Sequence, residues 1–387
     1  MLDLSELYHH ISQIAASDYA IPASEFSSRS TLFAATTVQL STQTQQQISQ
    51  LIQAIESVIA LPAYQQKVLA SAPATAQYQP AAQGLWLGYD FHLTESGVKL
   101  IEINTNAAGA GMIGLIEQAL NLDTTWQQTY PATFLSEWQL QRQNQALRTV
   151  AIVDHNPTAQ YFYPEFLLFK ALLEKQGIQV YIADPQELRY NGQQLFLDHQ
   201  PIDLIYNRLT DFWLEAPVLD ALRRAYLDDA IVLTPHPRAY ALHADKHNLV
   251  WLSDSQWLAE IGVSQAVRNI LAAGIPPTFL IKPNQADALW HQRKGLFFKP
   301  AGRFGGKGVY KGASITHKVF QDICLQDYVA QTLVIPSQQV LSMGNYKLDI
   351  RAYVCHQTVV KLAGRLYQGQ TTNFRSVGGG FAAVRSQ

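Results

Sequence analysis

Residues 84–106 read GLWLGYDFHLTESGVKLIEINTN, two largely apolar runs on either side of a turn signal. The turn signal is Thr94–Gly97, in which Gly97 can adopt a positive φ. Two such runs around a glycine-containing turn predict a β-hairpin. A small-residue segment, NTNAAGAGM, overlaps its end at residues 104–112, as expected of a loop that lies close to phosphates.

The hairpin carries polar side chains on an otherwise apolar background. Glu102 and Asn104 are two residues apart on one strand and therefore share a face. If the hairpin turns around Ser96, Asp90 lies opposite Glu102 and joins that face. Three oxygen ligands on one face suit Mg²⁺, which keeps several waters and bridges to phosphates. The alternative is an edge hairpin whose polar face is simply in water.

The composition limits the class of protein. With 387 residues the chain is too long for one ordinary core, and we expect two or three packed subdomains. Hydrophobic residues make up 48% and charged residues 15%, which indicates a globular protein. The net charge of −2 offers no basic excess for nucleic-acid binding. Cys324 and Cys355 lie far apart and predict ordinary thiols, and the N-terminal residues have no signal or membrane pattern, so we expect a cytoplasmic protein without membrane contact.

The remaining sequence divides around the hairpin. Residues 1 to about 75 have a helical pattern, with apolar spacing typical of a helix over 42–69, and another helical stretch covers 114–147. Strands and helices alternate from about 150 to 235, which predicts a mainly parallel sheet. Helices and then strands follow. We therefore expect an α/β (α+β) protein with segments 1–145, 146–235 and 236–387.

Residues 295–312, GLFFKPAGRFGGKGVYKG, predict a strand, a glycine-rich turn and a second strand. Backbone N–H groups in such a turn can converge on phosphate oxygens, and Lys299 and Lys307 can offset phosphate charge. The spacing fits neither a Walker A loop nor a Rossmann fingerprint. By itself the pattern is equally well explained by a tight β-turn with solvated lysines.

The C-terminal segment 347–384 predicts two paired strands and a glycine-rich stretch. Arg351 and Arg365 lie on the strands and Arg375 enters the loop. Arginine binds phosphate or carboxylate through two parallel hydrogen bonds. Asn373 and the backbone of Gly378–Gly380 add donors. Each arginine alone is better explained as a strand-edge charge, whereas three around one glycine loop favour a binding site.

Together these segments resemble the ATP-grasp superfamily. LDIRAYVCHQTVVKLAGRLYQGQTTNFRS (348–376) followed by GGG resembles the DIR…R…FRSN…GG segment of RimK-type ligases. ADKHNLVWLSD (244–254) and GIPPTFL (274–280) resemble their DK helix and the GI-x-x-P-x-T step. FFKPAGRFGGKGV (297–309) resembles the lysine strand with its glycine loop, and CLQDYV (324–329) the hinge that contacts adenine.

The order of the segments resembles a different branch of that superfamily. In RimK-type ligases a helix, a strand with Asp and a strand with Glu-x-Asn follow the glycine loop; here they precede it, as residues 42–69, Asp90 and Glu102–Asn104. Eukaryotic glutathione synthetase and glutathionylspermidine synthetase have this order. The resemblance implies a circularly permuted ATP-grasp fold with a pre-grasp α/β domain at 146–235. It also implies that the hairpin 85–104 pairs in one sheet with the strands at 347–367 and that the helix near 42–69 packs against that sheet.

The sequence also departs from these families. Val377 stands where RimK-type ligases have Asn, and Leu87-Gly88 replaces an arginine of glutathione synthetase. The second departure argues against glutathione synthesis.

The resemblance implies an ADP-forming carboxylate–amine ligase that acts through an acyl phosphate, with ATP and Mg²⁺ as cofactors and small-molecule carboxylate and amine substrates. The residues fall into groups by expected role: Asp90, Glu102 and Asn104 for Mg²⁺; Lys246 and Lys299 for the α- and β-phosphates; Gly305, Gly306, Lys307 and Gly308 for the closing loop; Gln326, Asp327, Tyr328 and Val329 for adenine; Arg351, Arg365 and Arg375 for the transferred phosphoryl group or the substrate carboxylate. On the substrate side we expect Asn207 and Arg208, which end a strand of the α/β domain, and Asn373.

Two other functions remain open at this point. One is a phosphotransferase that stops at a phosphorylated carboxylate, and the other is a non-catalytic ATP-binding protein. ADP release that requires an amine distinguishes the ligase from the phosphotransferase. The sequence leaves open the substrates and whether the protein forms a homodimer.

Overall fold

The computed structural model describes residues 3–282, 286–302 and 308–387. The N-terminal region contains α1 (Leu4–Tyr19), α2 (Ser24–Ser27), β1 (Phe33–Leu40), α3 (Thr42–Ile59), α4 (Pro62–Leu69) and α5 (Ala74–Gln77). The prediction that this region is helical throughout is wrong at β1. That segment contains Phe33, Thr36, Thr37 and Val38, residue types that favour strands, and it pairs in parallel with the C-terminal β18. Its partner lies at the other end of the chain, so a local pattern did not reveal it.

The largest sheet, sheet A, joins both ends of the chain. Its strand order is β1-β18-β17-β16-β2-β3, and β15 also pairs with β16. The strands are β2 (Leu87–Thr94), β3 (Gly97–Asn104), β15 (Ser337–Leu341), β16 (Gly344–Cys355), β17 (Thr358–Tyr367) and β18 (Gly380–Ser386). Because β2 pairs antiparallel with β16, the prediction that the hairpin shares a sheet with the strands at 347–367 is confirmed.

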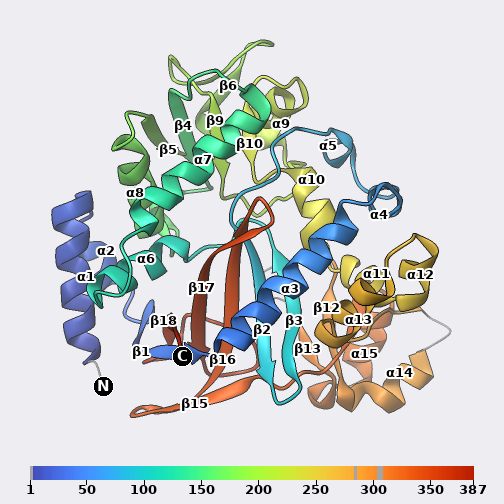
Figure 1. Ribbon diagram of the computed structural model, residues 1–387. Helices are drawn as coiled ribbons and strands as arrows, with labels where there is room; N and C mark the ends of the chain where they lie inside the picture. Colours follow the sequence, from blue (N-terminus) through green and yellow to red (C-terminus); the bar gives the residue numbers. More distant parts are fainter. Residues whose placement is uncertain (1–2, 283–285, 303–307) are drawn as a thin grey trace.

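The face of sheet A that α3 covers is apolar. The opposite face carries polar residues at the β2–β3 hairpin and apolar residues such as Tyr353 and Phe381, which pack with α6. Alternation places Tyr89 and Phe91 of β2 with Ile350 of β16 on the face that α3 covers. Figure 1 shows α3 crossing in front of these strands. The helix buries Ile48, Leu51, Ile52, Ile55 and Ile59 there, and each such side chain contributes about 1.5–3 kcal/mol. The predicted helical segment 42–69 therefore packs on sheet A as expected, although Pro62 begins a separate helix, α4.

The middle of the chain forms a four-stranded parallel sheet in the order β10-β9-β4-β5, which confirms the predicted parallel pairing. Its elements are β4 (Thr149–Val153), α8 (Tyr163–Glu174), β5 (Gln179–Ala183), β9 (Leu204–Asn207), α9 (Asp220–Leu227) and β10 (Val232–Thr234). A small antiparallel sheet of β6 (Leu188–Tyr190), β7 (Leu195–Leu197) and β8 (Gln200–Pro201) is inserted. The predicted helical stretch before it is two helices, α6 (Ala110–Ala119) and α7 (Trp126–Arg142).

The third sheet has the order β11-β14-β12-β13. It comprises β11 (Thr278–Leu280), β12 (Leu296–Pro300), β13 (Tyr310–Lys311) and β14 (Tyr328–Thr332). The helices of this part of the chain are α10 (Pro237–Ala239), the π-helix η4 (Tyr240–Ala244), α11 (Asn248–Ser253), α12 (Ser255–Glu260), α13 (Gln265–Gly274), α14 (Ala286–Gln292) and α15 (His317–Cys324). Of these, α14 and α15 share the core of the third sheet, whereas η4, α11, α12 and α13 pack into the core of sheet A and α3. The sequence pattern also predicts a strand at ICLQDYV (323–329), but the strand begins only at Tyr328, because α15 continues to Cys324.

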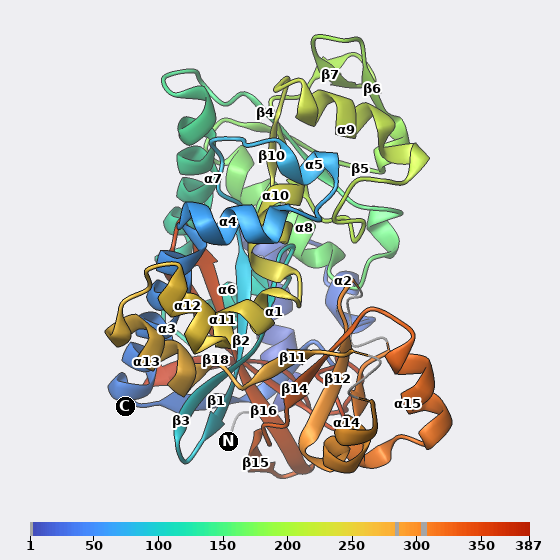
Figure 2. The same ribbon diagram turned by 90° about the vertical axis from the view of Figure 1, so that its right-hand side faces the viewer.

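Short 3₁₀ helices connect these elements: η1 (Pro157–Ala159), η2 (Pro185–Glu187), η3 (Pro217–Leu219), η6 (Arg293–Gly295) and η7 (Gly312–Ser314). In Figures 1 and 2 the parallel sheet lies at one end of sheet A, and the third sheet lies beside the β2–β3 hairpin. The polar face of the hairpin thus has a second sheet next to it. The division of the chain at residues 145 and 235 stays a prediction.

Candidate active site

The register of the β2–β3 hairpin brings its polar residues together. Asp90 lies opposite Glu102, as predicted. The turn, however, is not centred on Ser96 as predicted. It consists of two residues, since Thr94 pairs with Gly97. A bulge at Ile101 inserts one extra residue between the turn and Glu102, and this shift sets the register.

Asp90 is the centre of a buried ion network. Its two carboxylate oxygens accept hydrogen bonds from Arg351 Nε and Nη2, both at 2.6 Å. Arg365 Nη2 lies 2.9 Å from Asp90 Oδ2, and its Nε donates to Asp349 Oδ1 at 2.6 Å. The hydroxyl of Thr372 donates to the other oxygen of Asp349. Burial raises the pKa of Asp90, but the two guanidinium groups outweigh it and hold this pKa below the usual value.

Glu102 and Asn104 complete the polar face of the hairpin. Asn104 Nδ2 lies 3.1 Å from Asp90 Oδ2 and 3.3 Å from Glu102 Oε1, so the three predicted metal residues do meet. Turning the amide would present its oxygen instead, and two carboxylates with one amide oxygen suit a hard cation such as Mg²⁺. Within the described residues no group of three or more His, Cys, Asp or Glu is arranged to hold a metal. Phosphates and waters would therefore have to complete the coordination shell.

Lys299 reaches this site from the third sheet. It is 3% exposed, and its Nζ donates to the carbonyl oxygen of Ile101 and to Gln331 Oε1, both at 2.7 Å. The bulge in β3 thus provides the carbonyl that accepts from the lysine. Burial lowers the pKa of Lys299 to about 8; Lys246 acts in the same direction, while Glu102 opposes it. Two lysines therefore lie near one another beside the carboxylates, an arrangement that favours an anionic ligand.

The predicted adenine hinge precedes and begins β14. Gln326 and Asp327 lie in the connection from α15, and Tyr328 and Val329 are the first residues of the strand. The hydroxyl of Tyr328 donates to the carbonyl oxygen of Gly308 at 3.0 Å, so the end of the glycine-rich turn reaches the hinge. The predicted loop residues Gly305, Gly306 and Lys307 lie outside the described residues.

The loop from β17 to β18 is organised by Asn373. Its Nδ2 donates to the carbonyl oxygens of Gln368 and Thr371, and its Oδ1 accepts from the backbone N–H of Arg375 and the hydroxyl of Ser376. The side chain of Asn373 thus shapes the loop. Arg375 is exposed, in contrast to the two buried arginines of sheet A.

The predicted substrate residues lie at the carboxyl end of β9. Asn207 donates to the carbonyl oxygen of Pro235 at 3.1 Å and accepts from the backbone of Leu209 at 3.0 Å, so it caps the loop. Arg208 is 7% exposed, and its Nη1 donates to the carbonyl oxygen of Ala107 and the hydroxyl of Tyr206. Its Nε is buried and has no hydrogen-bond partner. An unsatisfied buried guanidinium N–H is costly, which favours a bound acceptor there.

Glu165 was not identified from the sequence. It is 1% exposed, and its carboxylate accepts from the backbone N–H of Gly109 at 2.8 and 3.0 Å and of Gly111 at 2.9 Å. These N–H groups open α6, where a carboxylate is favoured by the helix dipole. Burial raises the pKa of Glu165, and the charge of Arg208 opposes this rise. Glu165 therefore holds the small-residue loop after the hairpin against the parallel sheet.

Two more residues of the site were missed. Asp349 and Gln331 contact Arg365 and Lys299, respectively. Alternation along β16 gives a signal for Asp349, because it lies two residues before Arg351 and hence on the same face. Gln331 carries no such signal, since its role depends on how two sheets meet.

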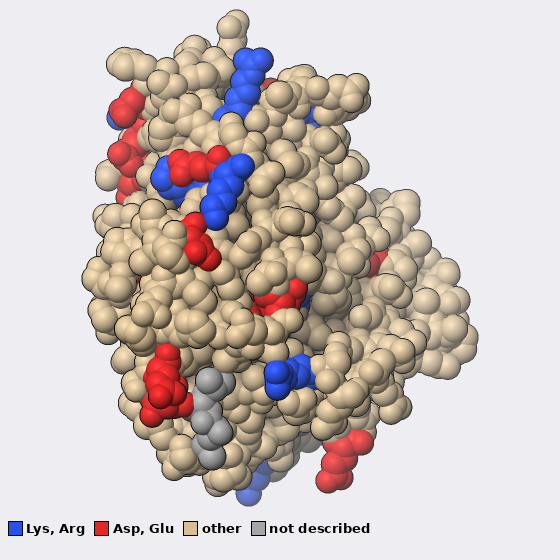
Figure 3. All heavy atoms as spheres, turned by 60° about the vertical axis from the view of Figure 1, so that its left-hand side comes forward, with Lys and Arg blue, Asp and Glu red and all other residues tan. Residues whose placement is uncertain are grey.

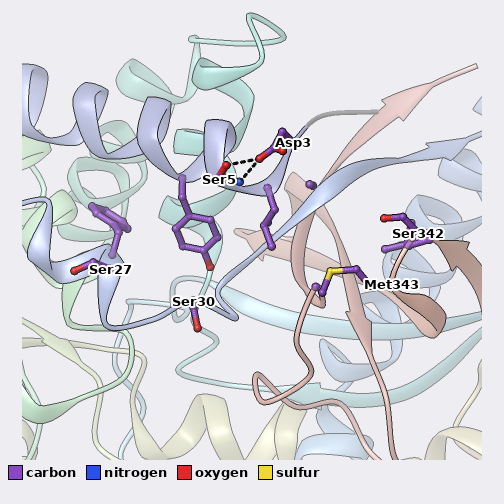
Figure 4. Close-up of a pocket in the computed structure, with 12 residues that line it drawn as sticks. Asp3, Ser5, Ser27, Ser30, Ser342 and Met343 are labelled. Carbon is purple, nitrogen blue, oxygen red and sulfur yellow. Dashed lines mark hydrogen bonds between the residues drawn. The ribbon is translucent and has the colours of Figure 1, made fainter.

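A separate hollow lies away from this site. A cavity of about 780 Å³ lies between α1, α2, β1 and the turn from β15 to β16. Figure 4 shows Ser27 and Ser30 on one side of it and Ser342 and Met343 on the other. Its lining shares no residue with the network around Asp90.

Figure 3 shows one face of the molecule, where charged side chains stand in small separate groups on a largely uncharged surface. Across the described residues, no helix combines the length and apolar character needed to cross a membrane.

Two solved structures share this architecture. A glutathione synthetase-like effector from Globodera pallida, in its apo form, aligns over 99% of this chain and 98% of its own, with a TM-score of 0.59 and 11% identity. A putative gamma-glutamylcysteine synthetase from Methylobacillus flagellatus aligns over 84% of this chain and 82% of its own, with a TM-score of 0.51 and 11% identity. The chain has the ATP-grasp fold. At this identity the likeness establishes the ATP-grasp architecture alone. No protein-family model and no curated protein matches the sequence.

Proposed function

We propose that this chain is an ATP-dependent carboxylate–amine ligase that releases ADP and phosphate. The observation that carries the proposal is the meeting of two sheets at one polar site. Lys299 comes from the third sheet, whereas Asp90, Glu102, Asn104 and two arginines come from sheet A. Phosphoryl transfer needs positioning and charge neutralisation more than covalent catalysis, and this set of groups offers both.

In the proposed reaction a carboxylate oxygen of the first substrate attacks the γ-phosphorus of ATP. The bond from that phosphorus to the β–γ bridging oxygen breaks, and ADP leaves. The amine nitrogen of the second substrate then attacks the acyl carbon, the C–O bond to phosphate breaks, and the nitrogen loses a proton. The products are an amide, ADP and phosphate.

The donor set fits Mg²⁺, which would be held by Glu102 and Asn104 with Asp90 beside them. Bound there, the ion would neutralise charge on the β- and γ-phosphates. Both oxygens of Asp90 already accept from guanidinium groups, so its larger contribution is to hold Arg351 and Arg365 in place. These arginines would face the transferred phosphoryl group.

The nucleotide would lie between the two sheets. Lys246 and Lys299 would contact the α- and β-phosphates, and the lowering of the pKa of Lys299 by burial and by the charge of Lys246 supports a shared anionic ligand. The backbone of residues 326–329 would contact adenine. The turn that ends at Gly308, including Gly305, Gly306 and Lys307, would close over the phosphates.

The carboxylate substrate would bind toward the parallel sheet. The buried, unpartnered Nε of Arg208 supports a role for this residue as a carboxylate donor. Asn207 and Asn373 would act by shaping the loops around the substrate, and the exposed Arg375 is available to contact it.

We also propose that the sequence order is a circular permutation of the RimK-type order. The completion of sheet A by β2 and β3, which precede the glycine-rich turn in the chain, supports this proposal. On this view residues 146–235 form the pre-grasp substrate domain.

The test is a screen of carboxylate and amine pairs with MgATP, with ADP and AMP separated by chromatography. We expect ADP and phosphate only when both substrates are present. AMP and pyrophosphate would contradict the mechanism, and ADP with a carboxylate alone would indicate a phosphotransferase. Glu102→Gln is the matched inactive control, because it removes one charge without changing the shape of the side chain.

A further inference from the structure

His247 connects the segment that contains Lys246 to the predicted adenine hinge. Its Nδ1 lies 2.8 Å from Asp245 Oδ1, and its Nε2 lies 2.8 Å from Asp327 Oδ1, a residue 80 positions away in the chain. A neutral imidazole carries only one N–H, so both contacts can be hydrogen bonds to carboxylates only when the ring is protonated. The backbone N–H of His247 also donates to Asp245 Oδ1 at 2.9 Å, which holds the ring near its own loop.

Asp327 also contacts the segment that leads into the glycine-rich turn. Its carbonyl oxygen accepts from the backbone N–H of Ala301 at 3.0 Å, two residues after Lys299. Lys246, next to His247, is near enough to Lys299 to lower its pKa. The ring of His247 therefore joins the two lysine-bearing segments and the hinge through one set of short contacts.

We propose that His247 is a positioning residue for the nucleotide: by clamping Asp327 to Asp245 it sets the distance between the hinge and the two lysines. We refer to these three side chains as the His247 clamp. That the clamp positions a nucleotide rests on the proposed function. The existence of the clamp rests only on the contacts given above.

A surface ion pair with no role is the competing explanation. Exposed pairs contribute little to stability, and Asp327 is 69% exposed in its side chain. His247 differs from such a pair because it contacts carboxylates on both sides and bridges two separate segments. We therefore expect its loss to change nucleotide affinity more than the unfolding temperature.

The clamp has a defined dependence on pH. The hydrogen bond to Asp245 raises the pKa of His247 to about 9, aided by the charges of Asp245 and Asp327 and opposed by burial. The described titratable groups that face the ring are these two carboxylates, and Lys246 is its neighbour in the chain. Because the folded pKa is raised, the clamp is complete below the ordinary histidine value and is lost as pH rises through about 9.

The experiment measures MgADP binding by calorimetry for the wild type and for His247→Gln, Asp327→Asn and the double variant. We expect each single variant to weaken binding about tenfold, the effect of losing one hydrogen bond between charged groups. The double variant should be no weaker than either single one, because both remove the same contact. His291→Gln, an exposed histidine on α14, is the matched control and should bind as the wild type does.

The ratio of wild-type to His247→Gln affinity should fall from about ten toward one as pH rises through about 9. Taking the ratio removes the titration of Lys299, which both proteins share. Unchanged binding in His247→Gln, or additive losses in the double variant, would overturn the clamp.

If the wild-type protein binds no MgADP, the result contradicts the proposed function and leaves the clamp to be tested separately. NMR titration of the His247 ring then tests the clamp. We expect a pKa of about 9 in the wild type and a lower pKa in Asp327→Asn. A value near 6.5 in the wild type would overturn it.

Discussion

Replacing Asp90 by Asn removes the carboxylate that two buried guanidinium groups share. The side chains of Asp90, Arg351 and Arg365 are only 4%, 11% and 7% exposed, so water replaces little of what is lost. Breaking a buried ion pair on one side typically costs about 3–5 kcal/mol. Only one of the two guanidinium groups then loses its ion pair: Arg365 keeps Asp349 at 2.6 Å, whereas Arg351 has no second ion pair within the described residues. We therefore expect a loss near the lower limit, about 3 kcal/mol.

This loss should be visible in thermal unfolding. For 387 residues, about 2.1 cal/mol/K per residue gives an unfolding entropy of roughly 0.8 kcal/mol/K. A destabilisation of about 3 kcal/mol then lowers Tm by about 4 °C. Since the pKa of Asp90 is depressed in the folded state, the difference between variant and wild type should persist at all pH values above the ordinary Asp value. It should shrink only as pH falls through the folded pKa.

Two variants serve as controls. Asp90→Asn with Arg351→Gln removes both charges and should recover part of the lost stability. Glu102→Gln should melt near the wild type but require more Mg²⁺ for MgADP binding. The reasoning fails if Asp90→Asn melts like the wild type and only its Mg²⁺ requirement rises, since Asp90 would then act chiefly as a metal ligand.

Lys299→Ala should weaken MgADP binding about ten- to hundredfold, as expected for one charged hydrogen bond, while the exposed Lys294→Ala should not; calorimetry at pH 7 compares them. Wild-type affinity should also fall as pH rises through about 8, where Lys299 loses its proton. Gly109→Ala should destabilise by about 2–5 kcal/mol in urea unfolding, because Gly109 has a φ of +110° and a Cβ there would meet the Phe381 ring. Gly192→Ala, with a φ of +97° and open space, should cost only about 1 kcal/mol. Arg365→Lys should lower kcat on the order of 100-fold with a smaller change in the KM for ATP, as measured in steady-state assays, if the guanidinium acts mainly in the transition state.

The sequence alone was sufficient for features that depend on neighbours in the chain. The two apolar runs in residues 84–106 and the glycine at 97 predicted the hairpin, and spacing placed Glu102 and Asn104 on one face. Helical spacing over 42–69 likewise predicted the apolar stripe that α3 buries against sheet A. These patterns reflect side-chain direction along a single element, which the backbone geometry determines locally.

Only the tertiary structure decided which groups neutralise one another. Asp90 and Arg351 are 261 residues apart, and their contact depends on β2 pairing with β16 in one register. The bulge at Ile101 places Glu102 opposite Asp90. Its carbonyl oxygen also accepts a hydrogen bond from Lys299, which comes from the third sheet. β1 was missed because its parallel partner is at the other end of the chain. Strand pairing and ion networks of this kind depend on which surfaces meet in space. The sequence pattern shows which residues are present, but it does not show which of them contact one another.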